Sequence, residues 1–250
     1  MSSRTGADRL VPSPVFILSP IRSGSTLLRC ILDTHSRIRA PHELHLADVA
    51  VRLSSPHAEL AVKTSGLTVP EIEHLLWDRM LHRELVLSGK DVVVDKTPDN
   101  LMLWRRLAEC WPRARYVFLV RHPLHILESA LAGIPDQSPA EIEKMVAAYL
   151  RELAAARREL PGPTVRYEDL TADTETVVRR VCAHLDVPWE PGMLAYGTVD
   201  HGPFVPGIGD FTEKIRSGVV LPGRGLPADS EVPPGLIAAC RAFGYLAAPG

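Results

Sequence analysis

Residues 14–26 read PVFILSPIRSGST, and this stretch predicts the fold of the chain. Pro14–Ser19 is a short apolar run, typical of a strand that is buried on both faces in a parallel sheet. The turn Pro20–Gly24 follows it, and then Ser25 and Thr26, which are helix-capping residue types, precede apolar residues at helical spacing. The stretch therefore predicts a strand, a tight turn and a helix in succession.

The same unit recurs along the chain. Further strands are expected at Asp91–Asp95, Arg115–Val120 and Thr164–Tyr167, with helices near Pro70–Leu87, Asn100–Cys110, Leu124–Leu131, Pro139–Leu160 and Thr174–Leu185. Strands that alternate with helices predict an α/β fold, a P-loop-type parallel sheet flanked by helices on both sides. Ligands of such sheets bind at the carboxyl ends of the strands, so we expect the functional site in the loops that follow the four strands.

Length and composition indicate one globular domain. The chain has 250 residues, 46% of them hydrophobic, and a formal net charge of -2, which does not favour binding to nucleic acid or an anionic membrane. We expect a flexible tail over residues 1–12 and a single domain over residues 13–250, with a loop-rich closing segment from about 188 to 250 that is rich in Pro and Gly. The composition does not predict an oligomeric state.

Cellular location is predicted from the cysteines and from the hydropathy. Cys30, Cys110, Cys182 and Cys240 are widely spaced and form no C-x-x-C pair, which favours reduced thiols in the cytoplasm. No apolar run reaches the roughly 18 residues of a membrane span, and residues 1–9 do not resemble an export signal. We therefore expect a cytoplasmic protein that is not anchored to a membrane.

The first candidate anion site is residues 19–26, SPIRSGST. In a P-loop frame, backbone N–H groups and the N-terminus of the following helix surround a phosphate. The Walker pattern G-x-x-x-x-G-K-[ST] is broken twice, because Ser19 replaces the first glycine and Ser25 replaces the lysine. Arg22 supplies a planar cation and Gly24 permits close backbone approach, so the loop suits a phosphate-like group without a metal. The alternative is an ordinary strand–helix turn with a surface arginine.

The second candidate anion site is residues 121–129, RHPLHILES, where the strand Arg115–Val120 ends. Proline is tolerated in the first turn of a helix, so a helix that starts near Pro123 contains Ser129. Arg121 and the Ser129 hydroxyl would then hold a second phosphate together. A surface salt bridge for Arg121 and a solvated serine are the alternative.

In this order, the two motifs resemble the paired 5′-phosphosulfate and 3′-phosphate signatures of sulfotransferases that use 3′-phosphoadenosine 5′-phosphosulfate (PAPS). The resemblance spans roughly Pro14 to Gly218 and is closest to the branch that contains tyrosylprotein sulfotransferases and the sulfotransferase domains of bacterial polyketide pathways. It implies PAPS as the donor, adenosine 3′,5′-bisphosphate (PAP) as the product, and a hydroxyl of a small-molecule or carrier-tethered natural product as the acceptor.

The resemblance also implies roles for single residues. It assigns the 5′-phosphosulfate to the first loop and the 3′-phosphate to Arg121 and Ser129. Tyr167 aligns with a position near the adenine, although a core tyrosine is the alternative. The residues expected to bind the nucleotide are Arg22, Ser23, Gly24, Ser25, Thr26, Leu27, Arg121, Ser129, Tyr167, Lys214, Ser217 and Gly218. Arg216 is an alternative nucleotide-binding cation in the same closing loop.

The residues expected to carry the reaction are Glu43, Lys96 and Ser217, together with His45. By resemblance, Glu43 is the base that deprotonates the acceptor, while Lys96 and Ser217 stabilise charge on the leaving side. His42 and His45 flank Glu43, and either is an alternative base because imidazole titrates near neutral pH. A zinc site is not expected, because zincins need two histidines four residues apart with the glutamate between them.

Two other function classes stay open. One is a P-loop kinase of small molecules, which the missing Walker lysine argues against. The other is a nucleotide-binding module without catalytic activity.

Contacts to the acceptor are expected in residues 44–66, 133–141 and 199–209. Within the last range, His201 and Phe204 are candidates for contact with the acceptor, and ordinary packing is the alternative role for both.

Overall fold

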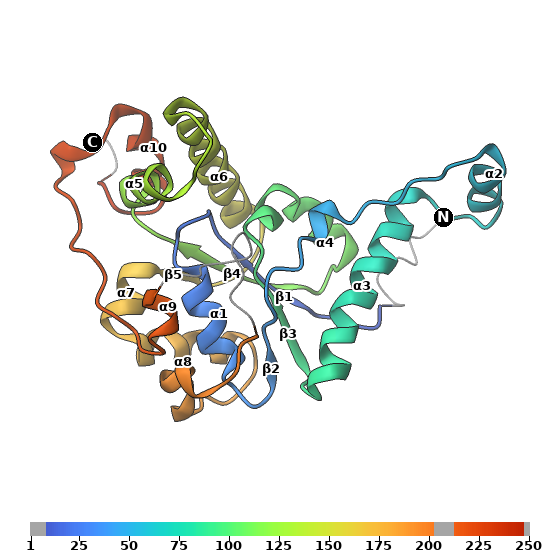
Figure 1. Ribbon diagram of the computed structural model, residues 1–250, viewed down its shortest axis with the longest axis horizontal. Helices are drawn as coiled ribbons and strands as arrows, with labels where there is room; N and C mark the ends of the chain where they lie inside the picture. The colour runs from blue at the N-terminus through green and yellow to red at the C-terminus, as the bar shows by residue number, and fades with distance from the viewer. Residues whose placement is uncertain (1–8, 203–212, 248–250) are drawn as a thin grey trace.

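The structure is a computed structural model that describes residues 9–202 and 213–247. A five-stranded parallel sheet forms its centre, in the order β2-β3-β1-β4-β5 (Figure 1). The strands are β1 (Val15–Leu18), β2 (Ile38–Arg39), β3 (Val92–Asp95), β4 (Arg115–Val120) and β5 (Thr164–Arg166). The predicted parallel α/β sheet is confirmed.

Alternating residues of β1 supply both halves of the core. Phe16 and Leu18 pack on one side with residues of α3 (Val69–Ser88), α4 (Trp104–Cys110), α5 (Pro123–Gly133), α6 (Pro139–Glu159) and α10 (Ile237–Ala242). Val15 and Ile17 pack on the other side with α1 (Ser25–Asp33), α7 (Tyr167–Ala172), α8 (Thr174–His184) and the 3-10 segment η3 (Pro191–Thr198). Successive side chains of a strand point to opposite faces, so a continuous apolar run is buried on both.

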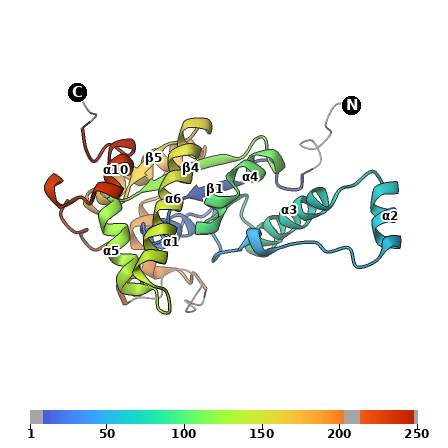
Figure 2. The same cartoon turned by 90° about the horizontal axis from the view of Figure 1, so that it is seen from above.

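The remaining elements are short. They are α2 (Pro56–Thr64), α9 (Glu213–Arg216) and the 3-10 segments η1 (Leu46–Asp48), η2 (Pro98–Met102), η4 (Asp229–Glu231) and η5 (Pro234–Leu236). Figures 1 and 2 place α2 at the far end of α3, away from the sheet, and none of its residues is buried. Within the described ranges, none of the helices has the length and apolar character needed to cross a bilayer.

Three details differ from the sequence prediction. The helix expected at 100–110 is divided into η2 and α4, because the backbone leaves helical geometry at Leu103 (φ -117°, ψ 18°). The elements β2, α2, α7, α9 and α10 were not predicted, and Tyr167, expected as the last residue of a strand, is the first residue of α7. Within the segment expected as a flexible tail, residues 9–11 are packed: the N–H groups of Leu10 and Val11 donate to Asp78, and Arg9 Nε donates to the Cys110 carbonyl.

Candidate active site

The loop between β1 and α1 has the backbone conformation of an anion-binding turn. Gly24 is the N-cap of α1 in the left-handed region (φ 85°), and it offers the first turn no side-chain cap. Arg22 is also left-handed (φ 58°), a conformation that costs an L-residue on the order of 1–2 kcal/mol. The Ser23 hydroxyl is buried and donates to the Pro20 carbonyl at 2.5 Å, so this serine shapes the turn. The N-terminus of α1 is therefore presented as an anion site.

The two predicted anion motifs meet in space. Arg121 Nη1 donates to the Arg22 carbonyl at 2.8 Å, and Arg22 Nε donates to the Ser129 hydroxyl at 3.1 Å. Ser129 was expected to work with Arg121, yet its hydroxyl is hydrogen-bonded to Arg22. The Arg22 side chain extends along α5, where its guanidinium also lies close to Gly133.

Arg121 and Tyr167 form one wall of this region. The Tyr167 ring lies against Gly24, and the Arg121 guanidinium sits over the ring at 4.7 Å from its centre. Burial lowers the pKa of Arg121, because desolvation disfavours the charged form, although arginine stays protonated in proteins. Arg121 Nε is buried and has no hydrogen-bond partner among the described residues. The wall thus holds a donor and a charge that suit an anionic ligand.

Lys96 and Glu43 form a buried ion pair beside the first loop. Lys96 Nζ contacts Glu43 Oε1 and lies 3.4 Å from the Thr26 hydroxyl of α1. Burial lowers the pKa of Lys96, while the neighbouring Glu43 opposes that shift. The second oxygen of Glu43 lies 3.3 Å from His45 Nε2. The predicted base, the predicted cation and the alternative base are therefore in one cluster.

The segment that carries Glu43 is held by residues whose roles the sequence did not reveal. The Thr97 hydroxyl accepts from the N–H groups of Leu44 and His45 at 3.0 and 3.3 Å, and it donates to Asp95. Asn100 also donates to Asp95, whose burial raises its pKa. In the sequence, these three residues are marked only by their position at the carboxyl end of β3 and directly after it, in residues 95–100.

The closing segment forms the other wall of a cleft of about 210 Å³. Its lining residues are Gly24, Leu27, Tyr167, Tyr196, Lys214, Ile215, Val219, Leu221 and Pro222. The predicted nucleotide-binding residues Gly24, Leu27, Tyr167 and Lys214 are thus brought together. Tyr196 was not predicted, and its hydroxyl donates to the Val219 carbonyl at 3.0 Å.

Ser217 and Gly218 lie in this closing segment but not in the lining. The Ser217 hydroxyl is exposed and donates to the Lys214 carbonyl at 2.6 Å, within its own turn. Gly218 is left-handed (φ 72°) and packs against Gly197, where a Cβ would lie 2.6 Å from the Gly197 Cα. Gly218 therefore permits a close backbone contact between η3 and the closing turn, and the structure does not direct the Ser217 hydroxyl into the cleft.

His42, the other alternative base, lies next to Glu43, with its Nδ1 2.9 Å from the Glu43 carbonyl. Within the described ranges, no group of three or more His, Cys, Asp and Glu side chains is arranged to hold a metal ion. His201, a candidate for acceptor contact, is buried against Asp33. Phe204, the other candidate, lies outside the described residues.

The family model for the sulfotransferase family matches residues 14–191, which contain both anion motifs, Glu43 and Lys96. The chain belongs to the sulfotransferase family. Among curated relatives of this chain, protein-tyrosine sulfotransferase 1 of Danio rerio is 26% identical over 201 residues, covering 72% of this chain and 55% of that protein. The chain spans 39–55% of the length of three curated relatives that it matches.

Two solved structures resemble the sulfotransferase fold described above. The sulfotransferase domain from the curacin biosynthetic pathway is 27% identical with a TM-score of 0.60, covering 79% of this chain and 82% of that domain. The sulfotransferase domain from the Synechococcus PCC 7002 olefin synthase is 22% identical with a TM-score of 0.70, covering 98% and 99%. The second likeness shows that the fold is shared over nearly the full length of both chains.

Proposed function

We propose that this chain transfers a sulfuryl group from PAPS to a hydroxyl of a small-molecule or carrier-tethered natural product and releases PAP. The observation that carries the proposal is the position of Lys96, which contacts Glu43 and lies 3.4 Å from Thr26 in the anion loop. One buried cation thus touches both a carboxylate base and the loop that would hold the transferred group. Such an arrangement stabilises charge that moves between the two.

The proposed reaction is a direct in-line displacement. The acceptor oxygen attacks sulfur while Glu43 takes the hydroxyl proton, a role that typically contributes about 10²–10⁴-fold. The new O–S bond forms as the bond from sulfur to the 5′-phosphate oxygen breaks, and PAP leaves with that electron pair. Lys96 stabilises the charge on the leaving oxygen. His45, 3.3 Å from Glu43, is the alternative base.

The second arginine supports a donor with a 3′-phosphate. Arg121 is half-buried and stays charged, and its buried Nε has no hydrogen-bond partner among the described residues, while its Nη1 donates to the backbone carbonyl of Arg22. Two cations at adjoining loops suit a nucleotide with two separate phosphate groups. Tyr167 and Lys214, which line the cleft, would contact the rest of the nucleotide.

The natural-product acceptor is supported by the extent of the structural likeness. The curacin-pathway domain is covered over 82% of its length, whereas protein-tyrosine sulfotransferase 1 is covered over 55%. We take the domain of similar size as the guide to the acceptor of this chain. The described cysteines are all free and buried, which supports our proposal of a reducing, cytoplasmic compartment.

Calorimetric titration of the purified protein with PAP tests the donor. We expect PAP to bind at least ten times more tightly than adenosine 5′-phosphate, which lacks the 3′-phosphate. Arg121→Ala should remove this preference, because it deletes the half-buried cation beside Tyr167. The matched control is Arg113→Ala, an exposed arginine that precedes the other end of β4. Equal binding of the two nucleotides by the unmodified protein would reject PAPS as the donor.

Radiolabelled PAPS and a panel of hydroxylated acceptors then test catalysis. We expect labelled product from the unmodified protein, and at least a hundredfold less from Glu43→Ala and from Lys96→Ala. Binding of PAP without transfer to any acceptor would favour a nucleotide-binding module. Mg²⁺-dependent consumption of ATP would favour a kinase.

A further inference from the structure

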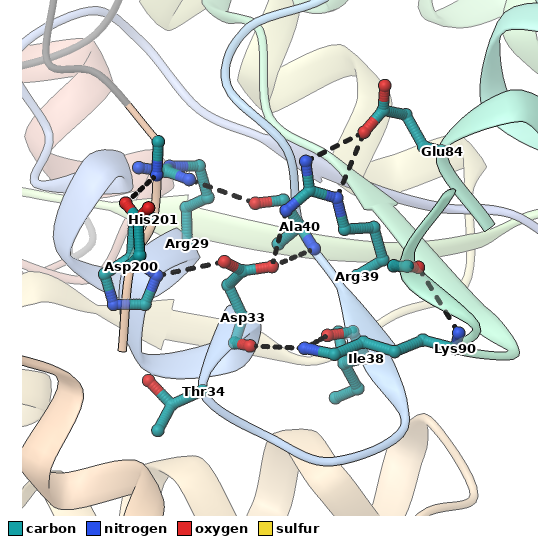
Figure 3. Close-up of polar contacts among 12 residues, drawn as sticks. Arg29, Asp33, Thr34, Ile38, Arg39, Ala40, Glu84, Lys90, Asp200 and His201 are labelled. Carbon is teal, nitrogen blue, oxygen red and sulfur yellow. Dashed lines mark hydrogen bonds and ion pairs between the residues drawn. The ribbon is translucent and has the colours of Figure 1, made fainter. Parts of the chain in front are cut away.

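The segment Ala40–His45, which carries Glu43, has no regular secondary structure. Side chains from other elements hold its backbone at both ends. At its start, the Ala40 N–H donates to Asp33 Oδ1 at 2.8 Å, and the Ala40 carbonyl accepts from Arg29 Nη1 at 3.0 Å (Figure 3). At its end, Thr97 accepts from two N–H groups. The position of Glu43 therefore depends on these anchors.

Asp33 also contacts the closing segment. Its second oxygen lies 2.9 Å from His201 Nδ1 (Figure 3). The other ring nitrogen of His201 lies 2.7 Å from the Tyr196 carbonyl. Both side chains are almost fully buried, with 2% of Asp33 and 7% of His201 exposed. Both ring nitrogens are engaged, which fixes the orientation of the imidazole.

The contacts continue from His201 to the nucleotide cleft. Tyr196 lines that cleft, and its hydroxyl donates to Val219, which also lines it. A continuous chain of contacts therefore runs from the cleft through Tyr196 and His201 to Asp33, and from Asp33 to Ala40, three residues before Glu43.

The charges around Asp33 favour its ionised form. Burial alone raises the pKa of a carboxyl, but hydrogen bonds from His201 and Ala40 and the cations Lys90 and Arg39 outweigh it, so the pKa of Asp33 lies below its usual value. Arg39 Nη1 is 3.6 Å from Oδ1, and Lys90 Nζ donates to the Asp33 carbonyl at 2.7 Å. The Asp33 carboxylate contacts Ala40, His201 and Arg39, and its backbone carbonyl is held by Lys90, so the buried residue makes a rigid anchor.

We propose that Asp33 is a positioning residue that couples the closing segment to the segment bearing the base. When His201 and Tyr196 are in place over the nucleotide, Asp33 is held, and it in turn holds Ala40 and thereby Glu43. Asp33 touches neither donor nor acceptor in this scheme. The inference deepens the proposed function, on which the role of Glu43 as base rests.

The first test is amide hydrogen exchange of the full chain, which requires no activity. His201→Ala should speed exchange by at least tenfold at residues 196–201 and also at Ala40, although His201 contacts Asp33 and Tyr196 rather than Ala40. Asp33→Ala should speed exchange in both segments. The matched control is Asp78→Ala, an equally buried aspartate that accepts from Leu10 and Val11 instead.

The second test separates turnover from nucleotide binding. We expect Asp33→Ala to lower kcat about 10- to 100-fold, as small misplacements of reacting groups do, with less than about threefold change in PAP affinity. Asp33→Asn should retain most of the turnover, because an amide can accept from Ala40 through its oxygen and donate to a ring nitrogen of His201.

Several outcomes would overturn the coupling. If His201→Ala speeds exchange only at residues 196–201, the two segments are independent, and this variant carries the test if Asp33→Ala does not fold. If Asp33→Ala lowers PAP affinity as much as kcat, or resembles Asp78→Ala in both assays, the role is merely structural. Failure of the unmodified protein to bind PAP would instead reject the proposed function, and the exchange result would stand by itself.

Discussion

Replacement of Gly24 by alanine tests the geometry of the anion loop most directly. At φ 85°, alanine pays the cost of the left-handed region, about 1–2 kcal/mol. The new Cβ would also lie 2.5 Å from Tyr167 Cε2 and nearer still to Cδ2. Relief of such a clash requires the Tyr167 ring to move, at a cost of about 1–3 kcal/mol. We therefore expect Gly24→Ala to lower the free energy of unfolding by about 2–5 kcal/mol.

A second glycine separates the two contributions. Gly66 has a similar φ of 74°, but nothing lies within 4 Å of the position of its Cβ. Gly66→Ala should therefore cost only the backbone contribution of about 1–2 kcal/mol. In a Tyr167→Ala background the clash is absent, so the further cost of Gly24→Ala should fall to that same value. Urea unfolding of the single and double variants measures these differences.

The affinity for PAP should also be lowered by Gly24→Ala and not by Gly66→Ala. Displacement of the Tyr167 ring also disturbs Arg121, which sits over that ring, so we expect Gly24→Ala to weaken PAP binding about tenfold, or about 1.4 kcal/mol. Gly66→Ala should bind PAP as the unmodified protein does. The reasoning is refuted if Gly24→Ala unfolds no more easily than Gly66→Ala, or if Tyr167→Ala does not reduce the cost.

Three further variants test the catalytic cluster and its anchors. Lys96→Met should lower the free energy of unfolding by about 3–5 kcal/mol, because it leaves Glu43 buried without its partner, and adding Glu43→Gln should recover part of the loss in a double-mutant cycle. Thr97→Val should cost about 1–3 kcal/mol and lower kcat, because two N–H groups lose their acceptor, whereas Thr97→Ser should behave as the unmodified protein in both assays. Because the pKa of Asp33 is lowered in the fold, its contribution to stability is present above the ordinary pKa of 3.8 and is lost as the pH falls below it. Urea unfolding between pH 6 and pH 2.5 should therefore show the difference between the unmodified protein and Asp33→Asn shrinking towards acid pH, and a constant difference would contradict the lowered pKa.

Local patterns were sufficient for most of the strands and helices. Apolar runs such as VFIL and VVVD are long enough to form buried parallel strands, and Pro at the first turn marked the start of α5 and α6. The strand β2 has two residues and exists because Ile38 and Arg39 pair with β3, which no local pattern encodes. The helix α2 buries no residue, so it has little of the apolar periodicity by which a helix is recognised.

By itself, the sequence determined the parallel α/β class and predicted the two anion motifs, because each depends on residues close together in the chain. The family resemblance that these motifs carry proposed Glu43 and Lys96, which lie 53 positions apart. Tertiary structure alone decided which side chains meet. It bonded Ser129 to Arg22, directed the Ser217 hydroxyl into its own turn, and joined Asp33 to His201, a residue 168 positions away. Contacts of this kind arise from the order of strands in the sheet and from the path of the closing segment, and neither is written in a local pattern.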